Sequence, residues 1–166
     1  MNINAIIVDN FLDKPDLVRN SVLSLPFEAQ GPYPGFRSDR ADKEYEAYIQ
    51  SKFEKILNCK IKEFVQDSFR FQLCTDNVES WVHKDETDFA AVLYLTPNAP
   101  PQSGTGIYTD TGKSFELVTA IGNVYNRLAI YDGQILHRSM LPGFGTDKDT
   151  GRLTQVFFFN VEKNNE

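Results

Sequence analysis

Alternation of apolar and polar residues dominates the chain from Ser68 onward. Short runs rich in Val, Ile, Phe, Tyr and Thr are separated by turn-forming pairs such as Asp132-Gly133 and Pro142-Gly143. Runs of this composition, bounded by turn residues at this spacing, predict about eight short β-strands. We expect these strands near residues 69–75, 80–85, 89–96, 105–109, 115–119, 127–131, 135–141 and 152–161.

The part of the chain before Ser68 has a helical pattern after one short apolar run. Residues 5–8 are all apolar and predict a strand. Apolar residues at helical spacing then predict a helix that starts near Asp13, the candidate cap, and stops before Pro26. A second helix, from about Asp42 to Leu57, carries an aromatic stripe that we expect to pack against a sheet. Between the helices, residues 30–40 are rich in Gly and Pro and predict a loop.

Strands that follow helices predict an α+β fold that is mainly β. Many short strands at this spacing are typical of a sandwich or jelly roll, and the N-terminal helices would cover one sheet. A chain of 166 residues is the size of one domain. We therefore expect a single domain over 1–166, with helical support in 1–67, a jelly-roll core in 68–161 and a tail in 162–166.

Composition narrows the classes of function. Apolar residues make up 41% of the chain and charged residues 24%, which is typical of a globular protein. A net charge of −6 argues against nucleic-acid binding, because such proteins present a basic face to phosphates. The sequence shows neither a membrane span nor a signal peptide, so we expect a cytoplasmic protein that does not bind membranes. Cys59 and Cys74 are expected to be buried, reduced residues.

The only two histidines suggest a metal site. His83 and Asp85 are two residues apart, so in a strand their side chains would project from the same face. With His137 from a distant strand they would form a set of two imidazoles and one carboxylate, which suits non-haem Fe(II) and O₂ chemistry. A His-x-Asp tripeptide also arises by chance, and the alternative is a surface histidine beside a solvated aspartate.

A second polar pair opens the last predicted strand. Arg152 and Thr154 share one face of that strand by the same period of two. An arginine that points into a small β-domain needs an anionic partner, and its planar fork matches a carboxylate. The alternative is a solvated arginine at the end of a loop.

These residues, together with several neighbouring segments, resemble a known family. The sequence is similar to the Fe(II)/2-oxoglutarate-dependent oxygenases, specifically their prolyl-4-hydroxylase-like branch, from about residue 69 to residue 160. Two departures are Gly104-Thr105-Gly106 in place of a Gly-Gly pair and a long segment between His137 and Arg152. The similar segments are Trp81-Val82-His83-Lys84-Asp85, Ala91-Val92-Leu93-Tyr94-Leu95-Thr96, Ser103-Gly104-Thr105-Gly106-Ile107-Tyr108, Arg127-Leu128-Ala129-Ile130-Tyr131-Asp132-Gly133, His137 and Arg152-Leu153-Thr154.

The resemblance implies a double-stranded β-helix and a set of roles for residues. It implies that Fe(II) is bound by His83, Asp85 and His137. It also implies that Arg152 binds the distal carboxylate of 2-oxoglutarate with help from Thr154. Tyr94 matches a position whose hydroxyl contacts the same carboxylate, and its alternative is a tyrosine packed in the core. Candidate residues for binding the substrate are Gln72, Trp81, Tyr108 and Arg138, with Tyr131, Tyr33 and Arg37 as further pocket walls, and each has packing or solvation as its alternative.

The expected function is a dioxygenase that uses Fe(II), 2-oxoglutarate and O₂ and releases succinate and CO₂. Its partner would be a peptide, hydroxylated for example at a prolyl residue, or a small metabolite. Two alternatives stay open. One is a cupin-like metal enzyme that does not use 2-oxoglutarate, although such proteins usually carry more histidine ligands. The other is a non-enzymatic jelly-roll interaction module.

Overall fold

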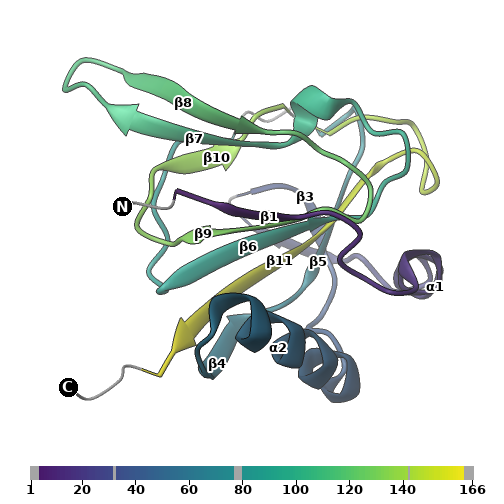
Figure 1. The fold of residues 1–166 in the computed structure, drawn as a ribbon. Coiled ribbons are helices and arrows are strands. Elements are labelled where there is room, and N and C mark those ends of the chain that lie inside the picture. Colours follow the sequence, from purple (N-terminus) through teal and green to yellow (C-terminus); the bar gives the residue numbers. More distant parts are fainter. Residues whose placement is uncertain (1–3, 32, 77–79, 142, 163–166) are drawn as a thin grey trace.

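Two antiparallel sheets face each other in the computed structural model of the protein, which describes residues 4–31, 33–76, 80–141 and 143–162 (Figure 1). The smaller sheet has the strand order β10 (His137–Ser139), β7 (Thr105–Asp110) and β8 (Phe115–Ile121). The larger sheet has the strand order β1 (Ile6–Val8), β9 (Leu128–Asp132), β6 (Phe89–Tyr94), β11 (Arg152–Val161), β5 (Phe69–Gln72), β3 (Tyr33–Arg37) and β2 (Ala29–Gly31), and β4 (Ile61–Gln66) also pairs with β11.

Two α-helices precede most of the strands, α1 (Pro15–Leu23) and α2 (Lys43–Leu57), and a short 3₁₀ helix, η1 (Pro101–Ser103), precedes β7. Helix α2 begins after Asp42, whose carboxylate accepts a hydrogen bond from the backbone N–H of Tyr45 at 2.9 Å. The helix lies across the outer face of the larger sheet (Figure 1). There the Phe53 ring is fully buried, with its centroid 5.0 Å from that of Phe157 and 5.3 Å from that of Phe159.

Strand β11 separates the apolar core from the interior between the sheets. Because successive side chains alternate in direction, Phe157 and Phe159 point to the helices. Thr154, Val156 and Phe158 point the other way and line a pocket. A second, smaller apolar cluster lies between the two sheets and comprises Tyr94, Ile107, Ile121 and Ala129.

The expected mainly-β architecture with helices on one sheet is confirmed, with corrections in the first half of the chain. The loop predicted over 30–40 is wrong, because residues there form part of β2 and all of β3. Gly35 takes a φ of +78°, which glycine adopts at little cost, and Phe36 pairs with Phe71 of β5. The region 1–67 is therefore not only helical, since β1, β2, β3 and β4 all join the larger sheet.

Three smaller predictions are also wrong. The strand expected over 80–85 is reduced to an isolated bridge between His83 and His137. Asp13 does not cap α1; its carboxylate instead accepts hydrogen bonds from the Tyr48 hydroxyl and the Lys52 ammonium. Both cysteines are free, but Cys74 is exposed in the turn after β5 and Cys59 is only partly buried.

Within the described part of the chain, none of the helices combines the length and the apolar character that crossing a membrane requires.

Candidate metal centre and adjoining pocket

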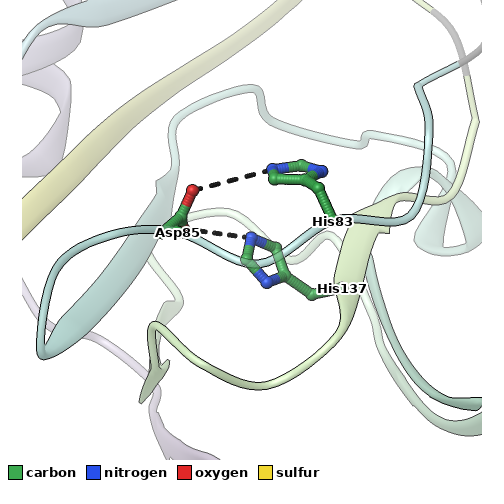
Figure 2. Close-up of side chains that lie close together, drawn as sticks. All are labelled: His83, Asp85 and His137. Carbon is green, nitrogen blue, oxygen red and sulfur yellow. Dashed lines mark ion pairs between the residues drawn. The ribbon is translucent and has the colours of Figure 1, made fainter.

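The two histidines and Asp85 converge at one end of the space between the sheets. Their potential ligand atoms all lie within 4.8 Å of one another. Nε2 of His137 is 3.2 Å from Oδ2 of Asp85, and Nε2 of His83 is 3.7 Å from Oδ1 of the same carboxylate. Figure 2 shows Asp85 facing both imidazoles. The sequence predicted that His83 and Asp85 project together and that His137 joins them from a distant strand, and the structure brings the three side chains together.

Backbone pairing holds the three side chains in place. His137 opens β10, which pairs with β7, and its imidazole is almost fully buried. His83 lies in the segment before β6 and exchanges two backbone hydrogen bonds with His137, of 3.0 and 2.9 Å. The backbone N–H of Asp85 donates to the Gly133 carbonyl at 2.7 Å. The side chain of His83 is one-third exposed, so the site opens on the His83 side.

Hydrogen bonding fixes the tautomer of both histidines. Nδ1 of His83 lies 2.9 Å from the Trp81 carbonyl oxygen, and Nδ1 of His137 lies 2.8 Å from the Ile135 carbonyl oxygen. A carbonyl oxygen can only accept, so Nδ1 carries the proton in each ring and Nε2 of the neutral ring presents its lone pair. This is the arrangement in which metal-binding histidines are oriented by their second nitrogen.

The lone pairs of the three groups are directed at a common space. Oδ2 of Asp85 is buried and makes no hydrogen bond with any described residue, despite its closeness to His137. A divalent cation placed among these atoms would give Oδ2 a partner and would be within reach of both Nε2 atoms. Two imidazoles and one carboxylate leave further metal positions open, as in non-haem Fe(II) sites. The donor set therefore fits such an ion.

Two adjoining pockets meet at this centre. An inner pocket of about 70 Å³ runs between the sheets, and an outer pocket of about 390 Å³ leads toward β3. His83 lines both pockets, together with Pro34, Arg70, Ser80 and Phe158. His137 lines only the inner pocket and Asp85 only the outer one, so the metal centre lies between the two spaces.

Arg152 also lines the inner pocket and is only 4% exposed. Its Nη1 donates to Oε1 of Gln72 at 2.8 Å, and its Nε donates to the Ser103 carbonyl at 3.2 Å. No described carboxylate forms a salt bridge with it, and burial lowers the pKa of its guanidinium. A buried cation without a counterion is costly, so the pocket favours an anionic ligand.

Thr154 and Tyr94 are both fully buried next to Arg152, but they differ in their contacts. The Thr154 hydroxyl lines the inner pocket and has no hydrogen-bond partner among the described residues. The Tyr94 hydroxyl lies 2.7 Å from the Thr105 hydroxyl, which lines the pocket in its place. Burial raises the pKa of Tyr94. Thr154 is therefore free to bind a ligand, whereas Tyr94 holds Thr105.

Three of the four residues expected to bind substrate line one of the two pockets, and one does not. Gln72 and Arg138 line the inner pocket, and Trp81 lines the outer one. Tyr108 lines neither pocket; its hydroxyl accepts a hydrogen bond from Nε of Arg138 at 3.0 Å. Gln72 is buried and bonded to Arg152, so it supports that side chain. Three further wall candidates also line the pockets, namely Tyr131 in the inner pocket and Tyr33 and Arg37 in the outer one.

Arg70 and Thr105 are pocket residues that the sequence did not single out for binding. Arg70 lines both pockets, and its position two residues before Gln72 in β5 was the signal that could have found it. Thr105 lines the inner pocket, but nothing in its sequence context distinguishes it from an ordinary strand residue.

Solved structures share this fold across nearly the whole chain. A Pseudomonas putida prolyl-4-hydroxylase matches with a TM-score of 0.61 and 17% identity, covering 96% of this chain and 94% of that one. HygX from Streptomyces hygroscopicus, solved with nickel, 2-oxoglutarate and hygromycin B, matches with a TM-score of 0.68 and 8% identity, covering 94% and 82%. A Trichoplax adhaerens prolyl hydroxylase in complex with a hypoxia inducible factor peptide fragment matches with a TM-score of 0.56 and 13% identity, covering 94% and 83%.

At these identities the likeness shows the fold, and the expected double-stranded β-helix is confirmed. No curated protein matches the sequence. A family model described as a family of unknown function, DUF6445, matches residues 2–120 and 109–159. Because these ranges cover most of the sequence, the chain belongs to the DUF6445 family.

Proposed function

We propose that this protein is an Fe(II)- and 2-oxoglutarate-dependent dioxygenase. The observation that carries the proposal is an inner pocket that reaches both a possible metal centre and a buried cation. Two imidazoles that line the pocket lie within 4.8 Å of the Asp85 carboxylate, and their Nε2 atoms face that carboxylate. The buried guanidinium of Arg152, which lines the same pocket, has no described carboxylate partner. A molecule with a metal-chelating group and a distal carboxylate satisfies both groups, and 2-oxoglutarate is such a molecule.

In this proposal His83, Asp85 and His137 hold the ion, and the rest of the pocket orients the cosubstrate. Arg152 binds the distal carboxylate, because Gln72 and Ser103 fix the direction of its guanidinium fork. The unpartnered Thr154 hydroxyl donates a second hydrogen bond to that carboxylate. The bound iron supplies the oxidative chemistry, in which O₂ and 2-oxoglutarate are converted to succinate and CO₂ while a substrate is oxidised.

Apolar and aromatic side chains form part of the wall of the inner pocket. Val92 and Val156 cover the pocket from the larger sheet. The Tyr131 ring packs on His137, with ring centroids 4.7 Å apart, and fixes the plane of that imidazole. The burial of Arg152 strengthens its attraction to a carboxylate, since a low dielectric constant screens charges less.

An anaerobic titration tests the proposal and separates it from the two alternatives. Fe(II) and 2-oxoglutarate added together should give a weak visible charge-transfer band. Arg152→Gln should lose the band, and Arg127→Gln should keep it, because Arg127 pairs with Asp9 outside both pockets. Metal binding without any such band would favour the cupin-like enzyme, and the absence of metal binding would favour an interaction module.

The reaction we propose is hydroxylation of a peptidyl residue, for example a prolyl residue, or of a small metabolite. The similar Trichoplax adhaerens structure holds a peptide fragment and HygX holds hygromycin B, so the fold accommodates both kinds of partner. Mass spectrometry of candidate peptides and metabolites should show a gain of one oxygen that depends on 2-oxoglutarate. Oxidation that continues without 2-oxoglutarate would contradict the proposal.

A further inference from the structure

Four arginines line the two pockets, although the chain as a whole has a net charge of −6. Asp85 is the only carboxylate among the described residues that line these pockets. Binding of 2-oxoglutarate in the proposed function uses the charge of one arginine, Arg152. Of the remaining three, Arg138 has partners of its own, since it donates to the Tyr108 hydroxyl and the Ser80 carbonyl. Arg37 and Arg70 line the outer pocket beside the metal centre, and their charges call for a second negative ligand.

Arg70 is the least satisfied of these arginines. Its strand β5 pairs it with Thr154 of β11 on one side and with Arg37 of β3 on the other. Its side chain makes no hydrogen bond or salt bridge with any described residue, and its buried Nε has no partner. Burial, Arg37 and Arg152 together lower the pKa of Arg70 to about 9. An anion beside Arg70 would relieve both the missing hydrogen bonds and the repulsion between like charges.

Arg37 lies next to Arg70 and is held by two contacts. Its guanidinium lies over the Tyr33 ring at 3.8 Å from the centroid, and its Nη1 donates to Oε1 of Gln66 at 2.8 Å. Its Nε is buried and has no described partner. The same Tyr33 ring is 5.0 Å from the Arg70 guanidinium. One aromatic ring thus supports two guanidinium groups in fixed positions, which reduces the entropy lost when they bind a ligand.

Arg37 and Arg152 line different pockets. Arg152 lines only the inner pocket, whereas Arg37 lines only the outer pocket, where Asp85 and Trp81 also lie. Arg70 reaches both pockets. A group bound by Arg37 and Arg70 would therefore enter from the outer pocket, on the exposed side of His83.

Resting on the proposed function, we propose that Arg37 and Arg70 bind an oxyanion of the primary substrate, a carboxylate or a phosphate. Two neighbouring guanidinium forks match the oxygens of either group through paired hydrogen bonds. The oxidised substrate is thus an acidic molecule, anchored by its negative group in the outer pocket. Its reacting carbon then lies toward His83 and Asp85.

Trp81, the only tryptophan of the chain, reports directly on this pocket. Acetate and inorganic phosphate are titrated separately at constant ionic strength, anaerobically with Fe(II) and saturating 2-oxoglutarate, while Trp81 fluorescence is recorded. Acetamide serves as the neutral control. We expect saturable binding of at least one anion and none of acetamide. The anion with the lower Kd, acetate or phosphate, identifies the oxyanion. Arg37→Gln and Arg70→Gln should each weaken the binding about tenfold, as expected when one charge-assisted hydrogen bond is lost. Arg127→Gln should not change it.

Two measurements keep this inference separate from the proposed function. The charge-transfer band of Fe(II) with 2-oxoglutarate should persist in Arg37→Gln and Arg70→Gln, which shows that both variants are folded and bind the cosubstrate. Loss of that band in Arg70→Gln but not in Arg152→Gln would overturn the inference, because Arg70 would then bind 2-oxoglutarate. Unchanged anion affinity in both variants, or no anion binding by fluorescence and by arginine Nε NMR signals, would also overturn it. Absence of the band in the wild type would contradict the proposed function, and the same titrations without iron would still test the arginine pair.

Discussion

Removal of the Arg152 charge should abolish the thermal stabilisation that 2-oxoglutarate gives to the metal-loaded protein. A ligand present at 100 times its Kd stabilises a folded protein by about 2.7 kcal/mol. For a domain of this size, 1 kcal/mol corresponds to roughly 2–4 °C in Tm. The wild type with a redox-inert metal such as Ni(II) should therefore gain roughly 5–10 °C when 2-oxoglutarate is added.

The size of the loss in Arg152→Gln follows from the burial of this side chain. Arg152 is 4% exposed, so its attraction to a carboxylate is little screened by solvent. A buried hydrogen bond to a charged group contributes up to about 3 kcal/mol, which corresponds to roughly a 150-fold change in affinity. At the same concentration the ligand would then be below its Kd. The remaining stabilisation would be about 0.3 kcal/mol, or about 1 °C.

Differential scanning fluorimetry or calorimetry, with and without 2-oxoglutarate, measures this shift for each variant against its own ligand-free Tm. The comparison within one variant removes any effect of the substitution on the stability of the ligand-free protein. Arg127→Gln is the matched control, because Arg127 pairs with Asp9 at 2.6 Å away from the pockets. A shift in Arg152→Gln as large as that of the wild type would refute the role assigned to this guanidinium.

Three further changes test the metal centre, the core and one buried carboxylate. Asp85→Asn should keep the fold but weaken Ni(II) binding at least about 100-fold in calorimetric titrations, because it removes the charged ligand that faces both imidazoles; unchanged affinity would exclude Asp85 as a ligand. Phe53→Ala should lower the free energy of unfolding in urea by about 4 kcal/mol, since the ring is fully buried against four other phenylalanines, and a loss below 1 kcal/mol would contradict this packing. Burial raises the pKa of Asp67 to about 6 despite the neighbouring Arg40, so the folded state binds a proton more tightly than the unfolded chain. The free energy of unfolding of the wild type, relative to that of Asp67→Asn, should therefore fall by about 2 kcal/mol between pH 4 and pH 7. If the free energies of unfolding of the two proteins change in parallel with pH, the raised pKa of Asp67 is contradicted.

The period of two along the strands predicted much of the fold and of the candidate site. It placed His83 and Asp85 on one side, although the backbone there forms only a single bridge, because an extended segment alternates its side chains with or without a complete ladder. It also placed Arg152 and Thr154 together in the pocket. The same rule applied to β5 would have added Arg70 to the candidate pocket residues, because it lies two residues before Gln72.

The strands in the first half of the chain could not be predicted in the same way. Strand β3 contains Pro34 and Gly35, which local propensity assigns to a loop. It forms because β5 offers a partner, with Phe36 opposite Phe71, and a tertiary contact of this kind leaves no local pattern. Which side chains reach the pocket also depends on contacts between residues that are distant in the sequence. Tyr94 could not be separated from a ligand-binding tyrosine until its contact with Thr105 was known.

Strand β11 pairs with β4, β5 and β6, all of which precede it in the chain. A ribosome makes those three strands first. Strand β5 can already pair with β3 and strand β6 with β9, but their edges toward β11 have no partner until β11 has been made. We therefore expect the nascent chain to remain open to chaperones until β11 has been made, and to aggregate when translation is interrupted before β11. Arg152 lies on the same strand. The pocket therefore gains its buried arginine only when β11 joins the sheet.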